Sequence, residues 1–348
     1  IPELDAVVGI GSNGKICDII REILLDKQAV CSYGAKTELS MEGGRIISTE
    51  PFYAYIKIAE GCSNNCTYCA IPSIRGKYRS RRMEDIVKEA RWLAENGVTE
   101  LVVVAQDTTR YGEDIYGKSM LPELLTALCE IDGFKWIRTL YCYPERITDE
   151  LLDVIAKEDK LVKYLDMPIQ HCDKTILKRM NRHGDRETLT ALIKKIREKI
   201  PNVTLRTTLI TGFPGETKEQ FEELCEFVKE IRFERLGCFA YSPEEGTPAE
   251  KFEDQVPLKD RERRAEIIME EQMIISDSLN EAALDSEVEV VCEGFDRYAE
   301  CYYGRSQADA PEIDGKIFFL SEDKVRVGEY VKVKIDDTMD YDLIGSKM

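Results

Sequence analysis

The stretch EGCSNNCTYCAIPSIRGKYRSRR, residues 60–82, carries three cysteines within eight residues. Cys62, Cys66 and Cys69 form a C-x3-C-x2-C pattern. Thiolates are strong ligands of zinc and of iron–sulfur clusters. A structural zinc site needs four ligands, usually two separated pairs, and the chain has no further CxxC pair. Three thiolates on a four-iron cluster leave one iron open to a substrate, so the pattern favours a cluster. A zinc site and three small core residues are the alternatives.

Composition narrows the class of protein. The chain has 348 residues, 12 cysteines and a formal net charge of −18. No export signal and no membrane-length apolar run occur, so we expect a cytoplasmic protein with reduced cysteines and no membrane partner. The acidity argues against a general nucleic-acid binder and suits a basic partner. Because the first residue is Ile, we expect the chain to be a fragment whose natural start is missing.

From about residue 52, strand-like and helix-like segments alternate, which predicts an α/β fold with a parallel sheet or barrel. Functional residues are then expected at the carboxyl ends of the strands. Residues 1–47 read as short αβ pieces from the tail of a domain, 257–284 as a long charged helix and 285–348 as a small antiparallel β-barrel. The expected barrel strands are YAYIKI at 53–58, LVVVAQ at 101–106, three segments starting at 137, 162 and 204, and RLGCFAYS at 235–242.

With its cysteine loop placed after the first strand, the chain resembles the radical S-adenosylmethionine (SAM) superfamily. The resemblance implies a partial TIM-like barrel in which Cys62, Cys66 and Cys69 hold a 4Fe–4S cluster. Its open iron would chelate the amino and carboxylate groups of SAM, and one electron would cleave SAM to a 5′-deoxyadenosyl radical. Tyr68 matches the aromatic position next to the adenine; plain packing of a loop aromatic is the alternative.

Other segments fit SAM contacts at strand ends. Gln106 follows an apolar run, where the superfamily places polar groups toward the SAM amino group, and Arg206 could pair with the SAM carboxylate. Gly212, in the turn ITGFPGET at 210–217, would let backbone approach a ligand, although it could simply shape a tight turn. Tyr241 begins the loop YSPEEGTPA at the end of the last strand, which resembles a barrel rim.

The resemblance extends to the methylthiotransferases and covers nearly the whole chain, with 48–256 as the barrel, 257–284 as a linking helix and 285–348 as a TRAM domain. The RimO branch adds a methylthio group to the β-carbon of an aspartate in the twelfth protein of the small ribosomal subunit; the MiaB branch modifies an adenosine of tRNA. The segments that resemble RimO are AQDTTRYG (105–112), YCYPERI (141–147), YLDMPIQH (164–171), FAYSPEEGTPA (239–249) and GRSQADAPEIDG (304–315).

Charge supports the RimO branch independently. Residues 285–348 hold 16 Asp and Glu against 8 Lys and Arg. A TRAM domain that grips RNA should be basic, whereas an acidic one suits a basic ribosomal protein, so direct RNA binding is not favoured. The tRNA branch remains one alternative, and a non-catalytic adaptor with a zinc-stapled loop is another. The resemblance also implies a one-electron donor such as flavodoxin or ferredoxin.

The family's second cluster needs three more cysteines, upstream of the segment that resembles DAVVGIG at 5–11. Cys17 and Cys31 lie after it and do not match those ligands. We therefore expect residues 1–47 to be a remnant of the N-terminal domain. The second 4Fe–4S cluster is expected only in the full-length protein, and this fragment alone is not expected to complete sulfur insertion.

Three further features have ordinary interpretations. The basic run RGKYRSRR at 75–82 could bind phosphate or RNA, but we expect most of its charges to lie in a solvated loop. Cys225 lies on the apolar face of a predicted helix and is expected to be a small core residue. His171 is expected to be a loop or core histidine rather than an iron ligand.

Overall fold

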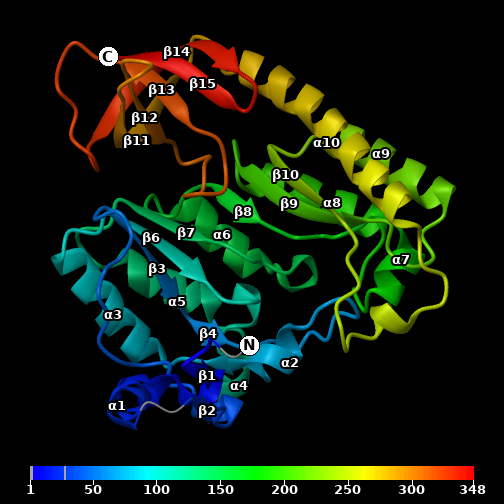
Figure 1. Ribbon diagram of the computed structural model, residues 1–348. Coiled ribbons are helices and arrows are strands. Elements are labelled where there is room, and N and C mark those ends of the chain that lie inside the picture. The colour runs from blue at the N-terminus through cyan, green and yellow to red at the C-terminus, as the bar shows by residue number, and fades with distance from the viewer. Residues whose placement is uncertain (1–2, 27–28) are drawn as a thin grey trace.

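Six parallel strands form an open arc at the centre of the molecule (Figure 1). The computed structural model describes residues 3–26 and 29–348. Strands β3, β6 and β7 pair in one sheet and β8, β9 and β10 in another. A parallel bridge between Ile137 and Leu161 joins the two sheets. The strands are β3 (Tyr53–Lys57), β6 (Glu100–Val104), β7 (Trp136–Thr139), β8 (Tyr164–Asp166), β9 (Thr204–Thr211) and β10 (Arg235–Ala240).

Helices cover the outer face of this arc (Figure 1). Local sequence fixes where several of them begin: the Thr217 and Gln220 side chains form a capping box at α9, and Asp185 and Thr188 form one at α8. The apolar faces of the helices pack on the strands as one large core. The helices are α3 (Met83–Glu95), α5 (Leu121–Cys129), α6 (Asp149–Lys157), α7 (Lys174–Arg179), α8 (Arg186–Lys199) and α9 (Lys218–Ile231).

Shorter elements lie before the arc in the sequence and around the cysteine loop. Near the N-terminus, β1 (Ala6–Val8) pairs in parallel with β2 (Val30–Ser32) beside α1 (Ile16–Asp26). A 3-10 turn begins at Ile10, directly after β1. The cysteine loop is flanked by β4 (Ala59–Glu60), α2 (Ile71–Arg75), β5 (Arg79–Ser80) and α4 (Glu113–Tyr116).

The C-terminal part begins with the long helix α10 (Leu258–Glu281), which packs across β10 and α9 (Figure 1). Five strands then close into a barrel in the order β11-β12-β13-β15-β14. The sequence predicts the small barrel but does not locate the strand DLIGSK, which lacks strict apolar–polar alternation. The strands are β11 (Glu287–Asp296), β12 (Cys301–Arg305), β13 (Ile317–Leu320), β14 (Tyr330–Met339) and β15 (Asp342–Lys347). The predicted fold class, a partial barrel followed by a small β-barrel, is confirmed. The small barrel is not wholly antiparallel as expected, because β13 and β15 pair in parallel whereas the other four strand pairs are antiparallel.

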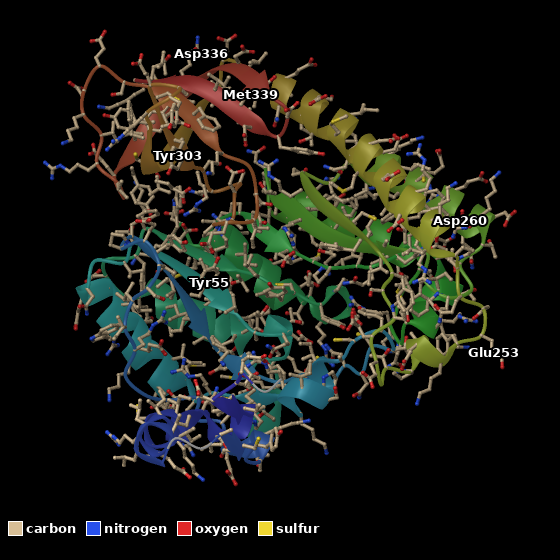
Figure 2. All side chains as sticks on the ribbon, in the orientation of Figure 1. Tyr55, Glu253, Asp260, Tyr303, Asp336 and Met339 are labelled. Atoms are coloured by element: carbon tan, nitrogen blue, oxygen red, sulfur yellow. The ribbon has the colours of Figure 1, made fainter. Side chains whose placement is uncertain are left out.

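The small barrel sends its 306–315 loop against the inner wall of the arc. The Pro311 carbonyl accepts the Tyr55 hydroxyl proton at 3.3 Å, and Asp314 accepts one from Tyr164 at 2.6 Å. Figure 2 shows Tyr55 in the region where the arc faces the small barrel. Asp309 pairs with Arg235 at 2.6 Å. The loop therefore closes one end of the arc and leaves the end at the cysteine loop open.

In the part of the chain that the structure describes, no helix has both the length and the apolar character required to cross a bilayer.

Candidate active site

The cysteine loop leaves the arc at the carboxyl end of β3 and is held by backbone contacts. The Cys62 N–H donates to the Gly76 carbonyl at 3.1 Å, and the Cys69 N–H donates to the Cys66 carbonyl at 3.0 Å. Gly61 makes this path possible, because it has a φ of +76° and a Cβ there would lie 2.4 Å from the Lys77 carbonyl oxygen. The loop is therefore a folded unit in which the three cysteines have fixed places.

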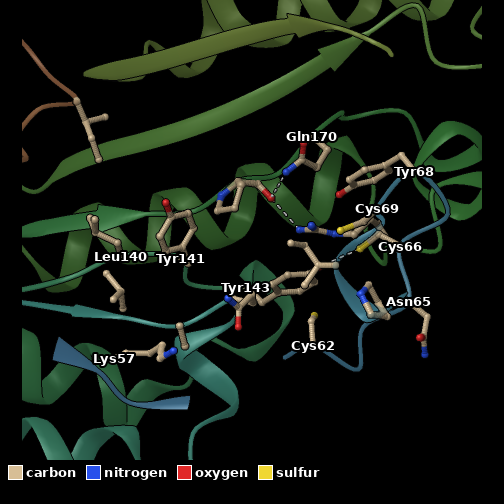
Figure 3. Close-up of a pocket in the computed structure, with 18 of the residues that line it drawn as sticks. Lys57, Cys62, Asn65, Cys66, Tyr68, Cys69, Leu140, Tyr141, Tyr143 and Gln170 are labelled. Atoms are coloured by element: carbon tan, nitrogen blue, oxygen red, sulfur yellow. Dashed lines mark hydrogen bonds between the residues drawn. The ribbon is translucent and has the colours of Figure 1, made fainter. Parts of the chain in front are cut away.

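All three cysteines line one cavity of about 620 Å³, within the range of small-molecule and cofactor sites. Figure 3 shows Cys62, Cys66 and Cys69 on one side of it and Tyr141 and Leu140 toward the other. The walls come from the carboxyl ends of the strands and from the cysteine loop, and Ile313 of the 306–315 loop also lines the cavity. Further lining residues are Tyr55, Lys57, Tyr68, Ile71, Pro72, Gln106, Tyr143, Gln170 and Arg182.

Cys66 has a polar partner in the cavity wall. Its Sγ lies 2.8 Å from the Tyr143 hydroxyl, a bond drawn in Figure 3. The Arg182 guanidinium lies 3.9 Å from the centre of the Tyr143 ring and donates to the Pro168 carbonyl at 2.8 Å. Cys66, Tyr143 and Arg182 are all buried, so this arrangement is shielded from water.

Burial influences the protonation of the thiols and phenols that line the cavity. It raises the pKa of the Cys62 and Cys69 thiols, and it is also the main cause that raises the pKa of Tyr68 and Tyr143. Both phenols therefore keep their protons at neutral pH and can act as hydrogen-bond donors. The thiols give up theirs only to a partner that stabilises thiolate, as a metal does.

Two glutamine side chains bring unpaired acceptors to the cavity. The buried Oε1 atoms of Gln106 and Gln170, both cavity residues, have no hydrogen-bond partner among the residues that the structure describes. Gln170 also has a φ of +72°, a conformation that side-chain-bearing residues rarely adopt. Buried polar atoms are normally paired, so the side-chain oxygens of these two cavity residues are candidates for pairing with a bound ligand.

The family comparisons agree with this geometry. The chain matches the family model of the Radical SAM superfamily over residues 56–228 and that of the TRAM domain over 286–347. It is 48% identical over 347 residues to the ribosomal protein uS12 methylthiotransferase RimO of Clostridium tetani, covering 99% of this chain and 77% of that protein. It is 50% identical to the RimO of Clostridioides difficile, covering 99% and 78%.

The chain belongs to the RimO family of radical SAM methylthiotransferases. The predicted family, the enzyme class and the TRAM domain are thereby confirmed.

Solved structures add a more distant likeness. One of them is the coproporphyrinogen III oxidase HemN of Escherichia coli, described as a radical SAM enzyme. It is 21% identical, and the match covers 65% of this chain and 52% of the HemN chain with a TM-score of 0.45. That score is too low to support a functional comparison.

Of the SAM contacts that the radical SAM resemblance implies, the structure brings Tyr68 and Gln106 to the cysteine cavity. It places the other three elsewhere. Arg206 is 2.9 Å from Asp166 and 3.6 Å from Asp314, and lines a separate cavity of about 440 Å³. Gly212 packs against Arg261 of α10, and Tyr241 is buried in a small apolar cluster with Phe213. Contact of these three with SAM stays a prediction.

Sequence reasoning missed Gln170, Tyr143 and Arg182 as cavity residues. Gln170 and Tyr143 lie within the RimO-like segments YLDMPIQH and YCYPERI, so those motifs could have pointed to them. Arg182 lies in no such segment, and its approach to Tyr143 depends on how α7 packs. No spacing in the sequence shows that contact.

The remaining sequence features have structural roles. His171 is fully buried, and its Nδ1 accepts the Asp173 N–H at 2.9 Å, as expected for a core histidine. Cys225 packs against the main core, which confirms its assignment. The expectation of solvated charges in the basic run is wrong for Arg81, which is 4% exposed and pairs with Glu42 at 2.5 Å and Glu89 at 2.7 Å.

Proposed function

We propose that Cys62, Cys66 and Cys69 hold one 4Fe–4S cluster in the cavity and that SAM binds beside it. The observation that carries this proposal is the meeting of three cysteines and two orphaned glutamine oxygens in one cavity. Among the described residues, no three His, Cys, Asp or Glu side chains lie close enough to grip a single metal ion. A four-iron cluster has a different requirement, since each thiolate binds its own iron.

The cavity residues fit SAM as well as the cluster. When bound, a 4Fe–4S cluster supplies the electron for reductive cleavage of SAM. The chain's own residues orient the ligand: Gln106 and Gln170 offer acceptors for its amino or hydroxyl protons, and Tyr68 with Ile71 and Pro72 offers an apolar wall for a base. The surrounding wall excludes water from the reacting atoms.

The proposed substrate is ribosomal protein uS12, modified at the β-carbon of an aspartate. Two observations support it: the RimO relatives are named for that protein, and residues 285–348 hold twice as many acidic as basic side chains. An acidic domain attracts a basic ribosomal protein and repels RNA phosphates. A flavodoxin or ferredoxin is the proposed class of electron donor.

We further propose the functional division that the sequence predicts. Residues 1–47 belong to the N-terminal domain, 48–256 form the radical SAM barrel, 257–284 link it to the small barrel and 285–348 form the TRAM domain. The position of α10 between the two barrels and the match of 286–347 to the TRAM model support these bounds.

Substrate choice is tested by binding at two salt concentrations. The chain is expected to bind purified uS12 more tightly than bulk tRNA, and tRNA association is expected to be weak at 50 mM and at 200 mM salt. Tight tRNA binding with a steep loss at the higher salt would overturn the uS12 assignment in favour of tRNA modification.

Cofactor use is tested by SAM cleavage. The anaerobically reconstituted chain, reduced with dithionite, is expected to release 5′-deoxyadenosine from SAM, and a Cys66→Ala variant is expected to release none. A matched variant, Cys17→Ala, changes an exposed cysteine far from the cavity and is expected to cleave SAM like the unaltered chain. Equal cleavage by Cys66→Ala would overturn the ligand assignment.

A further inference from the structure

Within residues 3–26 and 29–348, the Tyr143 hydroxyl has one side-chain hydrogen-bond partner, the sulfur of Cys66, at 2.8 Å. Tyr143 is 8% exposed and its ring forms part of the cavity wall. When Cys66 binds iron it is a thiolate and has no proton to give, so the phenol must be the donor of this bond. A charge-assisted hydrogen bond then lies directly on a cluster ligand.

Arg182 places a positive charge behind the phenol. Its guanidinium lies 3.9 Å from the Tyr143 ring centre, a short cation–π contact, and the residue is 5% exposed. Its Nη2 donates to the Pro168 carbonyl at 2.8 Å, which fixes its position. That partner is neutral, so the bond leaves the guanidinium charge in place. Low exposure also means that solvent screens this charge weakly.

Hydrogen bonds to cluster sulfurs and nearby charge are among the factors that set the potential of an iron–sulfur cluster. Reduction adds one electron, supplied by an external donor, and therefore adds negative charge to the cluster and its sulfurs. A donor on a ligand sulfur and a buried cation beside it both stabilise the reduced form. The hydrogen bond from Tyr143 and the charge of Arg182 therefore shift the reduction potential in the same direction, and both act near Cys66.

We propose that Tyr143, supported by Arg182, raises the reduction potential of the cluster through the Cys66 sulfur. This inference rests on the proposed function, since it needs Cys66 as an iron ligand. Tyr143 is then a residue that tunes the electron-transfer step. A mere packing role would leave the potential unchanged when only the hydroxyl is removed.

The test is an anaerobic redox titration of the reconstituted chain, with the reduced cluster followed by electron paramagnetic resonance. Tyr143→Phe removes one oxygen atom and keeps the ring under Arg182. The expected result is a more negative midpoint potential, with the reduced-to-oxidised ratio at a given potential falling about tenfold, which is about 59 mV for a one-electron couple. Iron content is expected to be unchanged.

Tyr141→Phe is the matched control. Tyr141 lines the same cavity two residues away, and in the part of the chain that the structure describes its hydroxyl makes no hydrogen bond to a cysteine. Its removal is expected to leave the midpoint potential unchanged. A shift of equal size in both variants would overturn the inference, because it would then be a general effect of cavity polarity.

Arg182→Lys and Arg182→Met separate charge from packing. The lysine variant is expected to keep a potential closer to that of the unaltered chain than the methionine variant does. An unchanged potential in Tyr143→Phe, with a full cluster present, overturns the inference whatever the Arg182 variants do. An unaltered chain that binds no iron would instead overturn the proposed function, so the two failures are distinguishable.

Discussion

Gln170 combines two unfavourable features in one residue. Its backbone occupies the left-handed region at φ +72°, which costs about 1–3 kcal/mol at residues that carry side chains. Its Oε1 is buried and has no hydrogen-bond partner among the described residues. Hydrogen bonds from its N–H to Thr208 and from Ile210 to its carbonyl hold the backbone in place. Such strain is retained where it positions a group for a ligand.

Replacing Gln170 should weaken SAM binding without weakening the fold. Gln170→Leu removes the acceptor that SAM would satisfy, at a cost of about 1 kcal/mol, or roughly fivefold in the dissociation constant. Thermal stability is expected to be kept, since an unpaired buried polar atom is removed as well. Equilibrium dialysis with SAM measures the affinity.

Gln255→Leu is the control for that measurement. Its Oε1 is also buried and unpaired within residues 3–26 and 29–348, but Gln255 does not line the cysteine cavity. SAM affinity in this variant is expected to match the unaltered chain. Equal loss in both variants would mean that Gln170 does not act on the ligand directly.

Some residues of the candidate site could be predicted from the sequence, and others could not. The three cysteines and Tyr68 were predicted because they are neighbours in one loop, where spacing is visible. The pairing of Arg206 with Asp166 and Asp314 was not predicted, since Asp314 reaches the barrel only through the 306–315 loop. Partners from distant elements leave no local pattern.

The turn between β9 and α9 shows a constraint at the scale of elements. Gly212 has a φ of +67°, and a Cβ there would lie 2.3 Å from Cγ of Arg261 on α10. Arg261 is itself fixed by bonds from its guanidinium to the Val256 and Tyr241 carbonyls. The glycine therefore lets α10 approach the strand ends closely.

Gly212→Ala is expected to destabilise the protein by about 2–5 kcal/mol, from left-handed strain of about 1–2 kcal/mol and overpacking of about 1–3 kcal/mol. Urea unfolding measures the loss. Gly246→Ala isolates the strain, because Gly246 has a φ of +80° and open space around it. Equal losses in the two variants would contradict the packing account.

Element boundaries were predicted best where caps and periodicity act locally. The predicted helix that carries Cys225 spans Lys218–Ile231, where Thr217 and Gln220 cap its start and its apolar face is regular. Strand β15 was missed because its pairing depends on β13 and β14, between which it lies. Strands placed by their partners need the tertiary structure to be seen.

At the scale of the whole molecule, a buried charge network joins the two barrels. Glu100 of β6 lies 3.0 Å from Arg138 of β7 and 2.7 Å from Arg305 of β12. All three side chains are essentially unexposed, and Arg138 also donates to the Gln307 carbonyl at 2.9 Å. Removing one partner of such a network leaves an uncompensated buried charge.

Glu100→Gln is expected to lower the free energy of unfolding by about 3–5 kcal/mol at neutral pH, as measured by denaturant titration. Glu289→Gln is the control, since the Lys135–Glu289 pair at 2.6 Å also crosses between the barrels but is exposed. Loss of this exposed ion pair should lower the free energy of unfolding by at most about 1 kcal/mol. Similar losses would contradict a special role for the buried network.

The same network predicts a pH dependence. Burial alone would raise the pKa of Glu100, but Arg138 and Arg305 outweigh it and hold the pKa below its ordinary value of 4.5. The network therefore stabilises the fold fully above pH 4.5 and loses that contribution as the pH falls further. The unfolding free energy of the unaltered chain should fall in this acid range more steeply than that of Glu100→Gln.

The most direct measurement is the iron and sulfide content of the chain after anaerobic reconstitution, beside Cys62→Ala and the control Cys17→Ala. About four irons and four sulfides per chain are expected in the unaltered protein and in the control, with loss of the cluster in Cys62→Ala. Zinc in place of iron, or a full cluster that survives Cys62→Ala, would contradict the assignment of the cysteine loop to radical SAM chemistry.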